Sequence, residues 1–156
     1  MTRITADESQ FDANSNIVTF EGNVELDNHD FDLTCDTLEV YMPKKEEGQV
    51  AANPAEDAAK GGIDKAIARG YVVIEKLKPD GTLQVAIARR AVYDAVTGNI
   101  VLTDFPQLQD GPNLIKGKTE ATRIYLRPNS GEYDVKGPAN YILDTDGKGL
   151  DMPTRN

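Results

Sequence analysis

Residues 16–26 read Asn-Ile-Val-Thr-Phe-Glu-Gly-Asn-Val-Glu-Leu, and this stretch decides the fold class. The apolar residues that share one face of an extended chain here are Val18, Phe20, Val24 and Leu26. The residues between them are polar, and such period-two alternation is typical of a β-strand with one buried face. Gly22 interrupts the apolar face, and a glycine inside a strand usually marks a bulge or a bend. The stretch therefore predicts a long strand that bends in its middle.

Similar bends are predicted at several later points of the chain. A glycine, turn former or proline stands in the place of Gly22 in residues 68–72, 102–106 and 135–139. A second pattern, in which inward residues are three and then two apart, occurs in residues 4–12, 33–41 and 86–94. The step of three breaks the period of two, which is the effect of a β-bulge. A looser fourth copy, residues 115–126, carries two additional residues near its middle.

The two halves of the chain resemble each other at a constant offset of 82 residues. The pairs related by this offset are Ala6 and Ala88, Asp12 and Asp94, Val18 and Ile100, Phe20 and Leu102, and Leu26 and Leu108. A constant offset indicates an internal repeat. We therefore predict one domain over residues 1–156, with tandem repeats at about 4–77 and 83–143 that each supply four bent strands. Residues 44–62 are expected to form a mobile surface insertion, and residues 144–156 a polar tail.

The inward phase of residues 83–88 stays open at this point. The repeat places Ala86 and Ala88 inward, yet the bulkier residues Leu83, Val85 and Ile87 lie on the opposite phase. Either the outer face of this strand is covered, or a bulge lies one residue away from its expected position.

Composition excludes several functional classes. The 156 residues carry a formal net charge of −9, which argues against nucleic acid as a partner because phosphate contacts require clustered Lys and Arg. The chain has no apolar run of about 18 residues that would span a membrane. It shows no signal peptide, and we expect that one has been removed. Cys35 is the only cysteine, so an intramolecular disulfide cannot form, and we interpret it as a small buried side chain at a bend.

No catalytic constellation is recognisable, and we predict a protein that is not an enzyme and uses no cofactor. His29 is the only histidine and lies in an expected turn. The neighbouring Asp27, Asp30 and Asp32 could in principle hold a cation, but alternation turns two of them to solvent, and no metal site is predicted. Neither a nucleophile elbow nor a phosphate-binding glycine loop occurs.

Eight bent strands joined by hairpins predict an all-β, elongated, twisted β-jelly roll in which two antiparallel sheets face each other. The inner faces would form an apolar trough. Its aliphatic lining suits acyl chains better than sugars, and the chain contains no Trp for stacking. The predicted lining residues are Ile4, Phe11, Val18, Phe20, Val24, Leu26, Leu33, Val40, Val72, Tyr93, Ile100, Leu102, Leu108, Ile115 and Ile124. For any single one of them, a place in an ordinary closed core is the competing interpretation.

Two further surfaces are predicted. Arg89, Arg90, Lys116 and Lys118 are near one another in the repeat register and could contact lipid phosphates at the rim of the trough, although plain solvent exposure is the simpler interpretation. The first strand, near residues 4–11, and the last, near 132–143, should be open edges that allow head-to-tail growth into homo-oligomers. We expect an edge amide near Thr5 to take part, and Pro138 to weaken the opposite edge by removing one donor.

The motifs Ile-Thr-Ala-Asp-Glu-Ser-Gln-Phe-Asp (4–12), Ile-Val-Thr-Phe-Glu-Gly-Asn-Val (17–24) and Gly-Asn-Ile-Val-Leu-Thr (98–103), the last followed by a proline, resemble the OstA-like (organic-solvent-tolerance protein A) family. The resemblance covers about residues 4–143. It implies a non-enzymatic periplasmic protein that carries lipopolysaccharide, with lipid A acyl chains in the groove. It also implies head-to-tail assembly into a bridge between related jelly-roll domains of the inner-membrane and outer-membrane transport components.

Alternatives to this function remain open. The chain could be a membrane-anchored partner or the N-terminal domain of an outer-membrane translocon, because both have the same fold as the bridge protein. It could also be a structural β-stack of the cell envelope with a closed core. A polysaccharide-binding jelly roll is less favoured because the chain lacks Trp.

Overall fold

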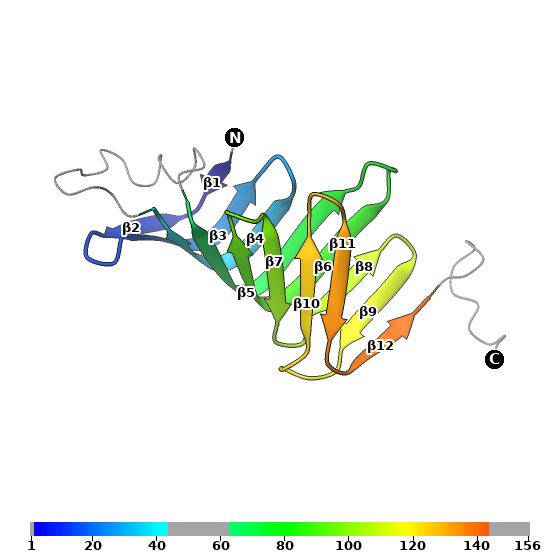
Figure 1. Ribbon diagram of the computed structural model, residues 1–156. Helices are drawn as coiled ribbons and strands as arrows, with labels where there is room; N and C mark the ends of the chain where they lie inside the picture. The colour runs from blue at the N-terminus through cyan, green and yellow to red at the C-terminus, as the bar shows by residue number, and fades with distance from the viewer. Residues whose placement is uncertain (1, 44–62, 144–156) are drawn as a thin grey trace.

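The computed structural model describes residues 2–43 and 63–143, and shows one 12-stranded antiparallel sheet that is folded along its length (Figure 1). The strands are β1 (Arg3–Thr5), β2 (Glu8–Asp12), β3 (Ile17–Asp27), β4 (Asp32–Tyr41), β5 (Lys65–Leu77), β6 (Leu83–Asp94), β7 (Asn99–Thr103), β8 (Gln107–Asp110), β9 (Asn113–Gly117), β10 (Arg123–Arg127), β11 (Glu132–Lys136) and β12 (Ala139–Ile142). The described residues contain no helix. The predicted all-β fold is therefore confirmed, whereas the expected insertion 44–62 and tail 144–156 lie outside the described residues.

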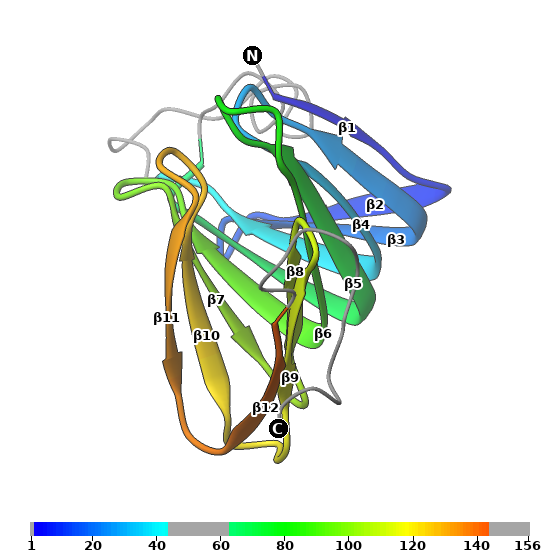
Figure 2. The ribbon, with the colours of Figure 1, turned by 90° about the vertical axis from the view of Figure 1, so that its right-hand side faces the viewer.

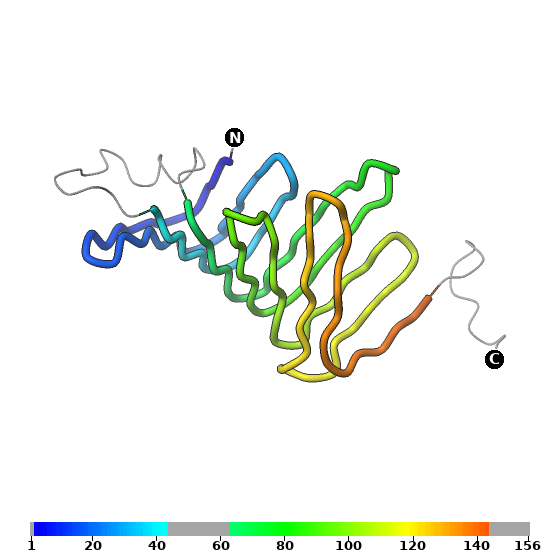
Figure 3. Tube along the Cα trace, in the orientation of Figure 1, coloured from blue at the N-terminus to red at the C-terminus, as the bar shows by residue number. Residues whose placement is uncertain are grey.

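The bends divide the sheet into two limbs that share four strands. Limb I contains β2, β7, β10 and β11 with residues 17–21, 37–41, 65–69 and 90–94. Limb II contains β1, β8, β9 and β12 with residues 24–27, 32–35, 72–77 and 83–88. The limbs join along a folded edge, formed by the bends, and the side opposite, where the hairpin turns lie, is called the mouth (Figure 2). Figure 3 traces the chain as a row of bent hairpins from β1 and β2 at one end to β11 and β12 at the other.

The bends are produced by consecutive residues with left-handed backbone conformation. Gly22 and Asn23 have φ angles of 82° and 47°, Gly70 and Tyr71 have 79° and 40°, and Asp104 and Phe105 have 70° and 57°. At the first two bends, these two residues oppose a single residue of the neighbouring strand, which is the definition of a β-bulge. A bulge bends the strand and increases its local twist, so the strand leaves one limb and enters the other.

Carboxylate side chains occupy the space that glycine leaves open at two of these bends. A Cβ atom added to Gly22 would lie 2.6 Å from Oδ2 of Asp7, and one added to Gly70 would lie 2.8 Å from Cβ of Asp36. The backbone amide of Asp7 also donates to the carbonyl of Gly22 at 2.9 Å. Glycine is thus required both for its conformation and for the close approach of the neighbouring strand.

Two hairpin turns 82 residues apart have the same hydrogen bonds. Asp12 accepts from Asn16 N at its carbonyl (2.8 Å) and from Asn14 N at its carboxylate (2.9 Å). Asp94 accepts in the same way from Gly98 N (2.7 Å) and Val96 N (2.9 Å). This is the geometry that a duplicated unit would produce, and the duplication itself stays a prediction.

The apolar core lies between the limbs and forms one continuous cluster. It extends from β3 to β10, and its central residues are between 0% and 7% exposed. In β6, Ala86 and Ala88 are buried, whereas Leu83 is 48% exposed. The alternation predicted from the repeat, with Ala86 and Ala88 inward, is therefore the one observed. The bulkier residues Val85 and Ile87 face outward, where they are only partly exposed.

We expect Gly70→Ala to destabilise the protein more than Gly81→Ala. Both glycines have φ angles near 80–90°, so each substitution carries the left-handed penalty of about 1–2 kcal/mol. Only Gly70 lies against another group, Asp36, whereas no atom lies within 4 Å of the Cβ position at Gly81. The extra loss at Gly70, about 1 kcal/mol or more, should appear in urea unfolding curves. Equal losses in both variants would mean that contact with Asp36 does not constrain the bend.

Candidate functional site

The interior between the limbs is the candidate functional site. All of the predicted lining residues lie in this one apolar cluster or pack against it. The buried ones are Val18, Phe20, Val24, Leu26, Leu33, Val40, Val72, Ile100, Leu102, Leu108, Ile115 and Ile124. The partly buried ones are Ile4, Phe11 and Tyr93. The inward set is thus brought together from strands of both limbs.

The apolar interior runs the full length of the described sheet and is less covered at its ends. Ile4 and Phe11 are partly buried at the end formed by β1 and β2. Tyr133 and Val135 are partly buried at the other end, on β11, and Tyr141 on β12 is 52% exposed. Side chains in the middle have almost no contact with solvent. The ends are therefore the places where apolar surface of the interior meets water.

The mouth is bridged near its N-terminal half by side chains from opposite limbs. Phe31, in the β3–β4 turn of limb II, packs edge-on against Tyr93 of limb I, with ring centroids 5.3 Å apart. The amide of Asn129, oriented with its nitrogen toward Asp30, donates to both carboxylate oxygens at 3.1 and 2.8 Å. Burial and the nearby charge of Asp30 raise the pKa of the Tyr93 hydroxyl. An aromatic contact and a polar contact thus lie side by side across the mouth.

A second bridge closes the mouth farther along. Gln84 of limb II is 1% exposed, and its Nε2 donates to the carbonyl of Gly131, in the β10–β11 turn of limb I, at 2.7 Å. A Cβ atom added to Gly131 would lie 2.6 Å from Cδ of Lys78, so the backbone at Gly131 and the side chain of Lys78 are also in close contact. Lys78 Nζ lies 2.8 Å from Oδ1 of Asp110, and burial followed by the charge of Asp110 raises the pKa of Tyr133. These groups form a polar layer directly above the apolar interior.

Gln84 was not among the predicted site residues. The alternation of residues 83–88 could have identified it, because the period of two that turns Ala86 and Ala88 inward also turns Gln84 inward. Its partner Gly131 lies 47 residues later in the chain, and no sequence pattern links the two.

The predicted basic rim does not lie at the mouth. Arg89 is at the folded edge, where its guanidinium lies 5.6 Å from the ring centroid of Phe105. Arg90 precedes the inward-facing Ala91 of β6 and Lys116 follows the inward-facing Ile115 of β9, so both point outward, and Lys118 begins the connection after β9. These side chains therefore lie at the folded edge or on the outer faces of the limbs, and do not line the interior.

The two end edges differ in which amides they offer. Asn28 N donates to Phe31 O at 2.9 Å, which fixes the hydrogen-bonding pattern of β3. The backbone amides and carbonyls of alternate β3 residues bond to β4, and those of the residues between them face β1. The register then pairs Arg3 and Thr5 with β3 and leaves the amide of Ile4 pointing to the free edge. The amide expected near Thr5 is therefore that of Ile4.

The expected effect of Pro138 on the opposite edge is wrong. The carbonyl of Pro138 accepts from Lys118 N at 3.0 Å and from Thr122 Oγ1 at 2.7 Å. In an extended strand, the nitrogen and carbonyl of one residue point to the same side. The nitrogen of Pro138 that lacks a hydrogen therefore faces the interior of the sheet, and the free edge of β12 loses no donor.

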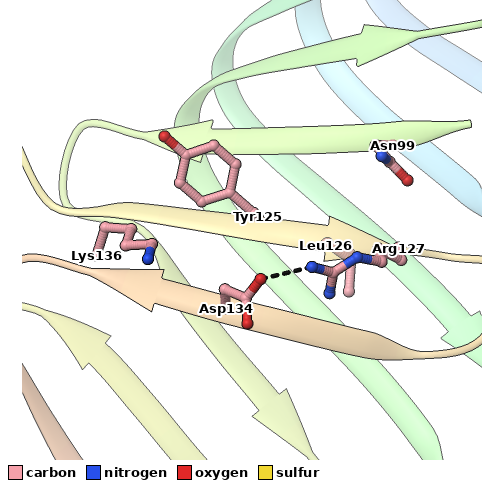
Figure 4. Close-up of a pocket in the computed structure, with 6 residues that line it drawn as sticks. All are labelled: Asn99, Tyr125, Leu126, Arg127, Asp134 and Lys136. Carbon is pink, nitrogen blue, oxygen red and sulfur yellow. Dashed lines mark hydrogen bonds and ion pairs between the residues drawn. The ribbon is translucent and has the colours of Figure 1, made fainter. Parts of the chain in front are cut away.

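A separate depression of about 220 Å³ lies on the outer face of limb I, over β7, β10 and β11 (Figure 4). Its lining residues are Asn99, Tyr125, Leu126, Arg127, Asp134 and Lys136. An ion pair between Arg127 and Asp134 crosses it at 2.5 Å. The charged, open lining distinguishes this depression from the apolar interior.

Groups that could support catalysis or metal binding are sparse in the described part of the chain. Within residues 2–43 and 63–143, no three His, Cys, Asp or Glu side chains are arranged to hold a metal ion. His29 is exposed in the β3–β4 turn. Among the same residues, there is no helix with the length and apolar character needed to cross a membrane.

We expect the Cys35 thiol to be unreactive in the folded protein. It is 6% exposed, and burial, reinforced by the charge of Asp36, raises its pKa to about 12. A thiol reagent at pH 8 should therefore label Cys35 only after denaturation.

Because the unfolded chain releases the proton of the Cys35 thiol near pH 9 and the folded chain keeps it, stability should fall as the pH rises from 9 toward 12. Cys35→Ala should reduce that fall, and rapid native labelling would contradict the burial.

Comparisons with known proteins agree with this architecture. The family described as "LptA/(LptD N-terminal domain) LPS transport protein" matches residues 3–131. The crystal structure of LptH from Pseudomonas aeruginosa, described as the LptA homologous periplasmic component of the conserved lipopolysaccharide transport device, is similar with a TM-score of 0.71 and 14% identity. The match covers 92% of this chain and 95% of that chain, and at this identity it shows the fold alone. A comparison with curated proteins returned no match.

The family match covers most of the chain and identifies the class of protein as one of lipopolysaccharide transport. The family consists of transport proteins without enzymatic activity, so the prediction of a protein that is not an enzyme is confirmed. The predicted resemblance to OstA-like proteins is confirmed as well. The folded antiparallel sheet, its continuous apolar interior and the match over residues 3–131 together lead to one conclusion: the chain belongs to the LptA/LptD N-terminal family of lipopolysaccharide transport proteins.

Proposed function

We propose that this protein carries lipopolysaccharide across the periplasm as one segment of a head-to-tail protein bridge to the outer membrane. The lipid A acyl chains lie against the apolar interior between the limbs. Related jelly-roll domains of the inner-membrane and outer-membrane transport components are its partners at the two ends. Family membership supports the transport class, and the description of LptH as a periplasmic component supports the location.

The observation that carries this proposal is the continuity of the apolar interior. A single cluster connects Ile4 and Phe11 at one end with Tyr133 and Val135 at the other. Burial of each acyl methylene in such a lining contributes about 0.8 kcal/mol. Since the apolar surface is uninterrupted along the sheet, a chain that moves through it keeps this contribution at every step.

A closed-core structural stack is the second candidate, and one observation favours it. The central lining residues, such as Val40, Val72 and Ile100, are 0% exposed, so the limbs are in full contact there. An interior of this kind holds acyl chains only if the limbs separate. The two candidates therefore differ in whether lipid reaches the inward side chains.

Photo-crosslinking distinguishes the two candidates. We expect a benzophenone side chain at Phe11 or Tyr133, which border the interior, to form an adduct with purified rough-chemotype lipopolysaccharide. The matched control positions are Tyr125, on the outer face of limb I, and Tyr71, which is 70% exposed at the folded edge. Adducts should be at least tenfold weaker there. Equal adducts at all four positions, or none at the inward pair in a folded protein, would favour the structural stack.

Strand alternation supports head-to-tail growth. Every neighbouring pair of strands is antiparallel, and limb II contains an even number of strands, in the order β1, β3, β4, β5, β6, β8, β9 and β12. The first and last strands therefore run in opposite directions. A second molecule placed beyond β12 in the same orientation presents its β1 antiparallel to that edge, which extends the sheet without a break. The same holds for β11 and β2 in limb I.

Ile4→Pro should abolish concentration-dependent oligomers, whereas Ile4→Ala should retain most of them. The proline removes the amide that points to the free edge of β1, and the alanine variant measures the separate loss of the side chain. Sedimentation velocity over a wide concentration range checks this. Thr5→Pro removes an amide that faces β3 and should instead lower the unfolding temperature. A parent protein that stays monomeric at millimolar concentration would rule out strand pairing at the ends.

A further inference from the structure

We propose that the acyl chains enter the interior sideways through the mouth, and that Asp30 with Asn129 and Gln84 with Gly131 form a latch that must open first. The proposal rests on the lipid-carrying function above and adds to it the route of entry. In the structure, the two bridges join the β3–β4 turn and the first residues of β6, both in limb II, to the β10–β11 turn of limb I. The central lining residues behind them are fully covered.

The latch consists of two polar contacts, the first of which lies beside the aromatic contact between Phe31 and Tyr93. Asn129 donates to Asp30 at the surface, where water competes for both groups. At the second bridge, Gln84 donates through Nε2 to Gly131 O, but its Oε1 is buried without a hydrogen-bond partner. When the limbs part, water reaches that oxygen, so the open state regains a hydrogen bond that the closed state lacks. The closed state is therefore held less firmly than the buried area alone would indicate.

The folded edge is built so that the limbs can rotate apart. The ladder between β3 and β4 shifts between Glu21 and Val24, and the ladder between β5 and β6 shifts between Arg69 and Val72. At these points, the regular hydrogen bonds that would hold a fixed angle between the limbs are interrupted. Rotation at the bends would leave the pairing within each limb intact. It would separate the turns of the mouth first, because they lie farthest from the folded edge (Figure 2).

A covalent lock across the mouth tests the proposal. In a Cys35→Ala background, the double variant Asp30→Cys and Asn129→Cys places two thiols in facing turns that are exposed or partly exposed. A short thiol-to-thiol cross-linker then joins limb I to limb II. We expect the cross-linked protein to take up purified rough-chemotype lipopolysaccharide at least tenfold more slowly than the same protein before cross-linking. Circular dichroism verifies that both forms are folded.

A matched control places the cross-link inside one limb. Arg127→Cys and Asp134→Cys replace an ion pair that joins β10 to β11 on the outer face, and cross-linking there should leave the rate of uptake unchanged. If the latch lock also leaves the rate unchanged, the chains enter through the ends and the proposal is wrong. If the latch variant takes up no lipid even before cross-linking while the control does, Asp30 and Asn129 have a binding role and the latch is again wrong. If neither protein takes up lipid, the proposed function itself fails.

Gln84→Ala provides an independent variant. Because it removes the hydrogen bond to Gly131 that holds the second bridge, uptake should become several-fold faster. The lock at Asp30 and Asn129 should cancel that gain, since both act on the same opening. A rate that is unchanged or lower in Gln84→Ala, or a gain that survives the lock, would contradict a shared latch.

Discussion

The pair of left-handed residues at each bend is the constraint on which the other features of this fold depend. An ordinary antiparallel strand has one buried face in one sheet, and a stack of hairpins would give a flat layer with one face bare. Here, Gly22 with Asn23 and Gly70 with Tyr71 redirect their strands. The two halves of each strand then lie in opposite limbs, and the apolar face of one limb covers that of the other. The carboxylates of Asp7 and Asp36 then fill the space beside the glycines. One local backbone choice, repeated along the stack, thus creates both limbs and the interior between them.

The overall fold could be predicted because its determinants are local. Alternation in residues 16–26 and the offset of 82 residues predict bent strands, and the bend at Asp104 and Phe105 was found although no glycine stands there. Aspartate tolerates left-handed backbone better than most residues, and Phe105 is held in that conformation at the folded edge with its ring partly exposed. The inward set followed from the same period of two, since every predicted lining residue belongs to the apolar cluster or packs against it.

The polar side of the site could not be predicted, for reasons that are equally physical. The contact between Asp30 and Asn129 joins turns far apart in sequence, and turn residues show no periodicity that would indicate their partners. The basic residues were close in register, but the direction of Arg89 depends on the bend rather than on spacing. The effect of Pro138 depended on which side of the strand its backbone groups face, and a sequence does not reveal this.

The interior combines full burial in the middle with a small polar layer at the mouth. Ala66, Ala68, Ala86, Ala88 and Ala91 line the two central strands, and such short side chains let the limbs approach closely. Deep apolar contact supplies stability, whereas the buried, unpaired Oε1 of Gln84 limits how firmly the mouth is closed. Under the proposed function, the protein holds a lipid and also releases it, and this division lets cohesion and opening depend on different residues.

The order of strands in the stack follows the order of the chain, and this has a consequence for how the molecule reaches its native state. Each of the long bent strands β3 to β6 pairs with the strand before it and the strand after it, so each strand is packed mainly against its neighbours in strand order. Such a topology resembles that of solenoid proteins, in which a nucleus at any point grows outward one hairpin at a time. Each intermediate ends in the same kind of unpaired strand as the finished molecule. The polypeptide must therefore complete its own sheet faster than a neighbouring chain can add to it, and the concentration of unfolded chains relative to the rate of folding becomes a determinant of correct assembly.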